Sequence, residues 1–191
     1  MTARRTRLAC ALAAALAAAG CAAATPPPDT ATIPLWAAPY WPDDDTAIMH
    51  AEWAWADPAR THGIPAEGTR AVAEIDYLAG ELSSNPRWVG MSPFAKMRML
   101  QARGDVRRVL GIAPDAPSQA VVTPLIAALA AMDAGNQRQV MASLSSPVFT
   151  LGPERTLAAL STLPYVQTAN LGTTMAAQSA TGPGEALNKG S

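Results

Sequence analysis

The chain has 191 residues, 49% of them hydrophobic, and a formal net charge of −1 at pH 7, which argues against general nucleic-acid binding. Its two cysteines, Cys10 and Cys21, both lie within the first 21 residues, so the rest of the chain has no thiol or disulfide chemistry. Stability must therefore come from a hydrophobic core, and the chain is long enough to form one.

Residues 1–21 have the order of a secretory signal. Three arginines come first, and residues 8–19 form an uncharged apolar run that is too short to span a bilayer as a permanent helix. The Arg4-Arg5 pair also suggests a twin-arginine signal, although Arg7 stands where that pattern has an apolar residue.

The end of this segment, Ala18-Ala19-Gly20-Cys21, resembles the lipobox of bacterial lipoproteins, in which small residues precede a cysteine that becomes the lipidated first residue. Ala18 departs from the usual pattern, where leucine is commonest. Cleavage by ordinary signal peptidase in the alanine run at 22–24 is the alternative. The resemblance implies an acylated, palmitate-bearing Cys21 on the periplasmic side. It also favours the outer over the inner membrane, since Ala22 is not the aspartate that retains such proteins at the inner one.

Composition divides the chain into four parts. A signal peptide covers residues 1–20, and the proline- and alanine-rich residues 21–34 read as a tether that starts at the lipidated cysteine. A single helical domain is expected over residues 35–180, and a disordered tail over residues 181–191. Removing the signal leaves 11 basic residues against 15 acidic ones, a formal charge of −4.

The domain begins with an aromatic arm. The stretch 35–55 holds five of the chain's ten aromatic residues, and its prolines predict an extended start before a helix over 46–56 that Asp43-Asp44-Asp45 caps. Large rings favour packing of this arm on the helical body. Trp36, Tyr40 and Trp41 could instead contact a membrane interface, or stack on a sugar or other ligand.

Two long helices follow. The helix over 66–83 carries an apolar stripe (Val72, Ile75, Leu78, Ala79, Leu82), with Glu74, Asp76 and Glu81 off it. Ser92-Pro93 predicts the start of a second helix that ends near Leu110. Its expected inward face is Met99, Ala102, Val106, Val109 and Leu110.

The stretch 118–134 predicts the core helix against which the others pack, with Leu125 and Leu129 buried. Because of Pro124, this helix either begins at Thr123 or runs from Ser118 with a kink at the proline. We favour the start at Ser118 with a kink. Further helices are expected over 137–144, from Pro153 with Leu157, Leu160 and Leu163, and over 165–180 with a break at Gly172. The fold class is an all-α, compact bundle of about six or seven short helices in antiparallel pairs.

No catalytic, nucleotide-binding or cofactor motif occurs in the sequence. His50, Glu52 and His62 are the alternative basis for a metal-dependent or hydrolytic enzyme. His50 and Glu52, two apart on a helix, point to different faces, so we expect ordinary surface residues and no metal site. An apolar-ligand carrier is a further alternative, lined by methionines 91, 97, 99, 132 and 141.

Charge is segregated along the chain. Nine acidic residues lie between Asp43 and Glu81, and the next stretch contains six of the basic residues: Arg87, Lys96, Arg98, Arg103, Arg107 and Arg108. The favoured interpretation is that the acidic and basic helices pair along a solvated edge. Otherwise the basic helix faces an anionic surface or an acidic envelope protein. We expect a lipid-anchored envelope protein with a non-catalytic binding or scaffolding domain.

Overall fold

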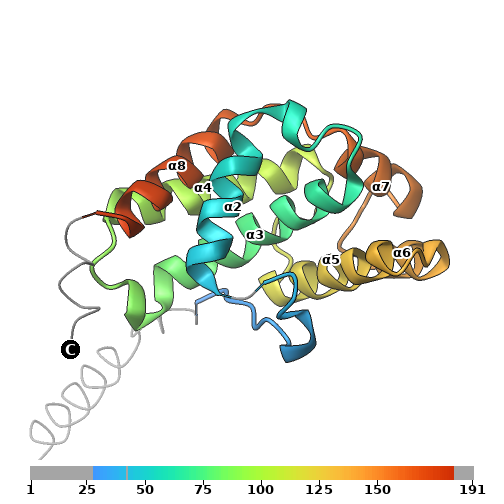
Figure 1. Cartoon of the computed structure of the whole chain (residues 1–191), viewed down its shortest axis with the longest axis horizontal. Coiled ribbons are helices and arrows are strands. Elements are labelled where there is room, and N and C mark those ends of the chain that lie inside the picture. Colours follow the sequence, from blue (N-terminus) through green and yellow to red (C-terminus); the bar gives the residue numbers. More distant parts are fainter. Residues whose placement is uncertain (1–27, 42, 183–191) are drawn as a thin grey trace, which may run out of the picture.

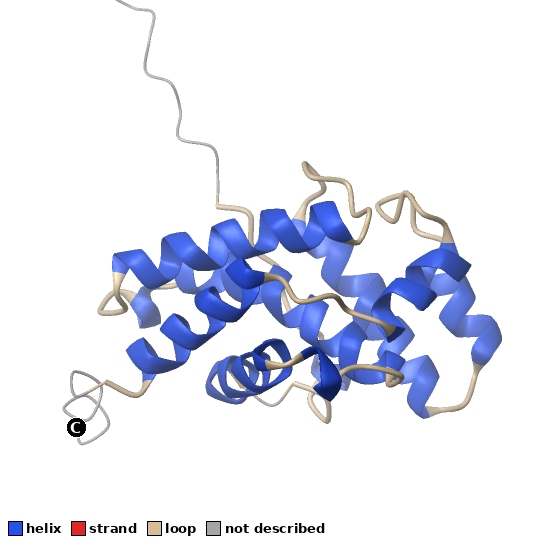
Figure 2. Cartoon of the chain, turned by 90° about the horizontal axis from the view of Figure 1, so that it is seen from above, coloured by secondary structure: helices blue, strands red, loops and turns tan. Residues whose placement is uncertain are grey.

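The computed structural model describes residues 28–41 and 43–182. Within them lie seven α-helices, and the only β-type pairing is an isolated bridge between Ile112 and Phe149, so the predicted all-α fold class is confirmed (Figures 1 and 2). The helices are α2 (Asp44–Ala56), α3 (Pro65–Ser84), α4 (Pro93–Val109), α5 (Ser118–Asp133), α6 (Gln137–Leu144), α7 (Pro153–Ser161) and α8 (Gln167–Ala180). None of these helices is both long enough and apolar enough to cross a bilayer.

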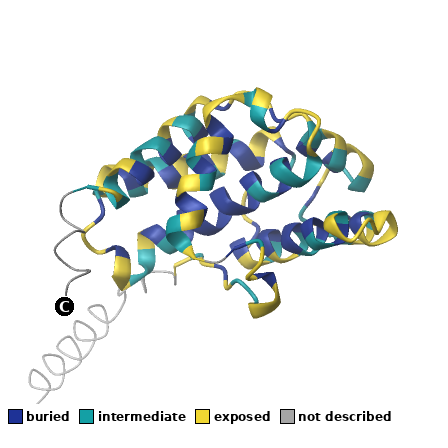
Figure 3. Cartoon of the chain, in the orientation of Figure 1, coloured by how far each residue is buried: buried dark blue, intermediate teal, exposed yellow. Residues whose placement is uncertain are grey.

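Helix α3 is the centre of the bundle. It contacts α2, α4, α5 and α7, and every residue from Ala71 to Gly80 is buried (Figure 3). The prediction that residues 118–134 form the centre of the bundle is therefore wrong. That stretch forms α5, which packs on α3 and α6 and buries Leu125 and Leu129 as expected. It begins at Ser118 and continues through Pro124, as favoured.

Two acids of α3 are the reason its central place was missed. Glu74 and Asp76 were expected off the apolar stripe, yet their exposed fractions are 0% and 2%. Asp76 is buried because Arg107 of α4 forms a two-pronged ion pair with it, with N–O distances of 2.6 and 2.7 Å. Arg107 also donates to the carbonyl of Ala116 at 2.7 Å, so both charges have partners.

Helices α4 and α8 pack closely. The predicted break at Gly172 is wrong, because α8 is continuous across it. A β-carbon at Gly172 would lie 3.0 Å from the carbonyl oxygen of Arg98, so the missing side chain lets the two helices approach. Val109, expected on the inward face of α4, is 40% exposed.

The segment just before the helices is not a free tether over its whole length. Residues 28–34 lie on the helical body, where the carboxylate of Asp29 accepts from the backbone N–H of Ser118 at 2.7 Å and contacts Arg103 at 3.0 Å. Ala31 is buried, and the Thr32 N–H donates to Gln119 at 2.7 Å. The proposed signal, Cys21, residues 21–27 of the tether and residues 183–191 of the tail lie outside the described residues.

The first part of the aromatic arm is not extended throughout, contrary to the prediction. It contains a turn of 3-10 helix, η1 (Leu35–Ala37), before the chain reaches α2. The cap was predicted correctly, since the Asp43 carboxylate accepts from the Thr46 N–H at 2.7 Å, although α2 begins at Asp44.

Candidate functional site

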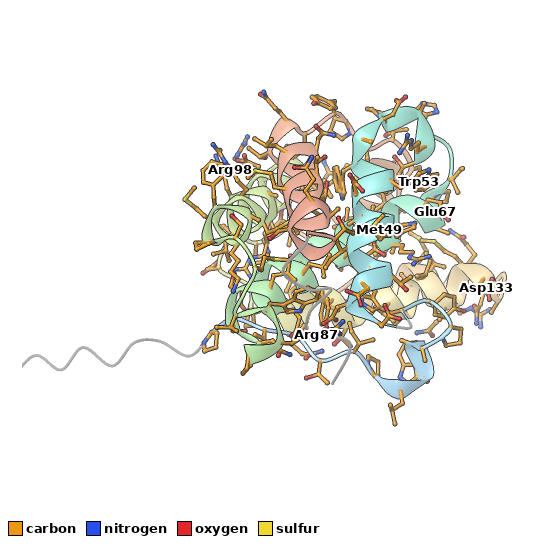
Figure 4. The ribbon with its side chains drawn as sticks, turned by 60° about the vertical axis from the view of Figure 1, so that its left-hand side comes forward. Met49, Trp53, Glu67, Arg87, Arg98 and Asp133 are labelled. Atoms are coloured by element: carbon orange, nitrogen blue, oxygen red, sulfur yellow. The ribbon has the colours of Figure 1, made fainter. Side chains whose placement is uncertain are left out.

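A hollow with a volume of about 550 Å³ lies where α3 begins and α5 ends. Its walls combine both signs of charge with apolar side chains, and Figure 4 shows two of the acids, Glu67 and Asp133, on the same side of the molecule. The lining residues are Tyr40, Gly63, Ile64, Pro65, Ala66, Glu67, Arg70, Leu129, Met132 and Asp133.

The ends of two helices give two walls of the hollow partial charges of opposite sign. The first turn of α3, with Pro65 as its first residue, has no side-chain cap, so this wall carries the positive end of a helix dipole. Asp133 is the last residue of α5 and lies at the negative end of that helix. Its carboxylate accepts from the Tyr40 hydroxyl at 3.1 Å, which connects the arm to α5 across the hollow.

A charged cluster supports the wall at Glu67. The Nδ1 atom of His50 lies 2.6 Å from the Glu74 carboxylate, and Nε2 lies 2.9 Å from Glu67. Arg70 donates from Nε to the other oxygen of Glu74 at 3.0 Å. An ionised carboxylate only accepts hydrogen bonds, so His50 satisfies both contacts as the imidazolium, which donates from both nitrogens.

The electrostatics of the cluster favour that charged histidine. Burial lowers the pKa of His50, but the hydrogen bond and negative charge of Glu74 and the hydrogen bond of Glu67 outweigh it and raise the pKa above its usual value. The pKa of Glu74 is raised, because its burial outweighs the lowering effect of the two cations beside it. The cluster of one imidazolium, one guanidinium and two carboxylates is neutral as a whole, so the burial of Glu74 is tolerated.

The raised pKa gives a testable pH dependence. His50 should contribute stability in full below about pH 6.5, the usual pKa in the unfolded chain, and lose it as the pH rises through its higher folded pKa. We therefore expect His50→Gln to lower the free energy of unfolding most near pH 6, with a difference from wild type that shrinks toward about pH 9. Urea unfolding at several pH values measures this.

His62 provides the matched control, because it is exposed in the loop before α3. His62→Gln should leave the pH profile unchanged. A His50→Gln deficit that stays constant from about pH 6 to pH 9 would mean that the histidine is not charged in this cluster.

The structure does not bring His50, Glu52 and His62 together as the ligands of one metal ion. His50 contacts Glu67 and Glu74 and so is not the surface residue expected, whereas His62 is exposed and Glu52 is partly exposed. Residues 28–41 and 43–182 contain no group of three histidine, cysteine or acidic side chains placed to hold a metal ion.

The methionines considered as the lining of a ligand cavity are dispersed. Met91 and Met99 are buried in the core, while Met97 is 50% exposed. Met141 is partly exposed on α6, and only Met132 lines the hollow. The hollow is therefore not lined by these methionines as a set.

The six basic residues separate into two groups, so neither interpretation of the charge pattern holds alone. Arg107 is buried and Arg103 is held by Asp29 and Ser118, so neither residue is available to a partner. The ion pair between Arg107 and Asp76 is buried and does not lie on the solvated edge that was expected. Arg87 contacts Asp45 at 2.7 Å. Of the remaining three, Arg108 is exposed, whereas Lys96 and Arg98 are partly exposed on α4.

The three aromatic residues considered for a membrane contact also differ in their exposure. Trp41 is only 5% exposed and packs edge-on against Tyr77, with 5.1 Å between ring centroids, so it pins the arm to the body. Tyr40 is partly exposed and bonded to Asp133. Trp36 remains 53% exposed beside the fully exposed Leu35.

Sequence reasoning missed Glu67, Arg70 and Asp133 as site residues. Each is an ordinary charged residue near a helix end, and no motif connects positions so far apart in the chain. A charged histidine between two carboxylates could have been suspected only if the packing of α2 on α3 had been known. Comparison with protein families, with curated proteins and with solved structures finds no match to this chain.

Proposed function

We propose that the chain is an exported envelope protein, held to a membrane by a lipid on Cys21, whose helical domain binds a small ligand without transforming it. The ligand class that fits the hollow is one with both an ammonium and a carboxylate group, such as an amino acid or a short peptide. The observation that carries the ligand proposal is the charged hollow between α3 and α5, whereas the anchor rests on the sequence Ala18-Ala19-Gly20-Cys21.

The charges available in the hollow support a ligand with two opposite charges. Arg70 uses Nε for Glu74, and its two terminal nitrogens have no hydrogen-bond partner within the described residues, so they can bind a carboxylate. Glu67 uses one oxygen for His50, and Asp133 is exposed, so both can accept from an ammonium group. Ile64, Leu129 and Met132 give the ligand an apolar surface.

Binding is favoured over catalysis because the histidine is engaged on both sides. A general base needs a free nitrogen within reach of the substrate, and both ring nitrogens of His50 contact carboxylates. Glu74 is fully buried and cannot touch a ligand in the hollow.

The anchor has its own test. Cys21→Ser should abolish labelling by a fatty-acid probe in cells, and a high-salt wash should then release the protein from membranes. The wild-type protein should resist the same wash, because an acyl chain is held by burial and not by charge. A Cys21→Ser variant that is still fully labelled would refute the lipid anchor.

The ligand class is tested by calorimetric titration of the mature chain with single amino acids and dipeptides. Asp133→Asn removes a charged acceptor and should weaken the binding of a responding ligand about tenfold or more. Glu154→Gln, an exposed charge change on α7, should have no effect. If no amino acid or dipeptide binds the wild-type chain, the proposed ligand class is wrong.

A further inference from the structure

The outward face of α4 exposes more apolar surface than a solvated helix needs. Phe94, Met97 and Leu100 are 47%, 50% and 41% exposed, while Ala95, Met99, Ala102 and Val106 on the other side of the helix are buried. Val89, in the loop that leads into α4, is 85% exposed. Large apolar side chains grouped in this way on one helix indicate a contact surface.

Cations border this apolar surface. Lys96 and Arg98 belong to the same two turns, and the guanidinium of Arg98 lies over the Phe94 ring at 4.8 Å from its centroid. Neither forms an ion pair with a described acid, in contrast to Arg103 and Arg107, although Arg98 donates one hydrogen bond to the Gln101 side chain at 2.8 Å. The only acid of α4, Asp105, is neutralised by Arg108 at 2.8 Å. The surface is therefore apolar with a net positive border.

The N-terminal segment brings the proposed anchor to this helix. Asp29 is bound to Arg103 of α4 itself, at 3.0 Å. Cys21 precedes Asp29 by eight residues, which span about 29 Å at most when fully extended. An acyl chain on Cys21 would therefore keep α4 close to the bilayer surface.

The opposite placement of the hollow is compatible with this contact. Figure 4 shows Arg98 at one side of the molecule and Glu67 and Asp133 at the other. A domain that rests on a membrane through α4 would keep the hollow open to the aqueous phase.

We propose that the outward face of α4, defined by Val89, Phe94, Met97 and Leu100 with Lys96 and Arg98, docks on an anionic phospholipid surface. The apolar side chains enter the boundary between head groups and acyl chains, and the two cations pair with lipid phosphates. Of the observations above, only the short length of chain between Cys21 and Asp29 depends for its relevance on the lipid anchor of the proposed function. The docking itself needs no acyl chain, so the two proposals can fail separately.

The test uses the mature chain, residues 21–191, with Cys21→Ser so that no lipid is attached. We expect it to sediment with vesicles that contain phosphatidylglycerol, less at high salt, and not with vesicles of phosphatidylcholine alone. Lys96→Gln with Arg98→Gln should weaken binding about 30-fold at low salt, since each basic residue near an anionic surface contributes about fivefold. Phe94→Ser with Met97→Ser should weaken it about tenfold or more.

Matched variants separate this surface from general charge and from the aromatic arm. Arg138→Gln with Arg155→Gln removes the same charge from exposed positions on α6 and α7 and should change binding less than about twofold. Leu35→Ser with Trp36→Ser removes the exposed apolar tip of the arm and should also have little effect. Urea unfolding confirms that each variant is folded.

Three results would overturn the proposal. The unlipidated wild-type chain could fail to bind anionic vesicles, the arm variant could lose binding while the α4 variants keep it, or the charge control could lose as much binding as the Lys96 and Arg98 variant. The last result would indicate attraction by charge without a docking face.

Discussion

Replacing Arg107 with methionine is expected to lower the free energy of unfolding by about 3–5 kcal/mol, because the change leaves Asp76 charged and buried without its partner. Asp76 is 2% exposed, and its two oxygens lie 2.6 and 2.7 Å from guanidinium nitrogens. The carbonyl of Ala116 also loses a buried donor. Urea or thermal unfolding of the mature chain measures the loss.

Two further variants test whether the pair, and not the arginine alone, is responsible. Arg107→Met with Asp76→Leu removes both charges and should recover most of the lost stability, since a buried ion pair is worth little more than an apolar pair of similar volume. Arg108→Met, on the next residue of α4, should change stability by less than about 1 kcal/mol because Arg108 is 71% exposed. A loss at Arg107 no larger than at Arg108 would mean that Asp76 is solvated.

The Arg107 pair also shows how far the sequence predicts this fold. Helix positions followed from local signals, such as the Asp43 cap, the Ser92-Pro93 start and the apolar residues three and four apart in 118–134. These signals depend on residues within one or two turns. The central place of α3 did not follow from local signals, because its buried acids look like a solvated face until their partners on α2 and α4 are known. Periodicity shows an apolar face and does not show a buried ion pair.

The candidate site could be predicted even less. The hollow joins residues 40, 63–70 and 129–133, which come together only after α3 and α5 pack. His50 was singled out from the sequence with Glu52 and His62, and its actual partners, Glu67 and Glu74, lie on a different helix. The partly exposed cations Lys96 and Arg98 belonged to a set recognised from charge alone, but their separation from the buried Arg107 required the three-dimensional structure.

Gly68→Ala is expected to destabilise the domain by about 1–3 kcal/mol or more, although alanine is the better helix former. Gly68 lies on α3 where α7 crosses it, and a β-carbon there would lie 1.9 Å from the carbonyl oxygen of Leu160. A backbone carbonyl cannot rotate away as a flexible side chain can, so α7 must shift. The shift would expose Leu160 and Leu163, which are 1% and 5% exposed.

Gly104→Ala is the matched control, because a methyl group at Gly104 of α4 would meet no atom within 4 Å. There the gain in helix propensity is unopposed, so stability should rise by up to about 1 kcal/mol. The two substitutions are chemically identical and differ only in what the methyl group meets. Hydrogen exchange should show faster opening of α7 in Gly68→Ala and not in Gly104→Ala. Equal stabilisation by both would contradict the close approach of α3 and α7.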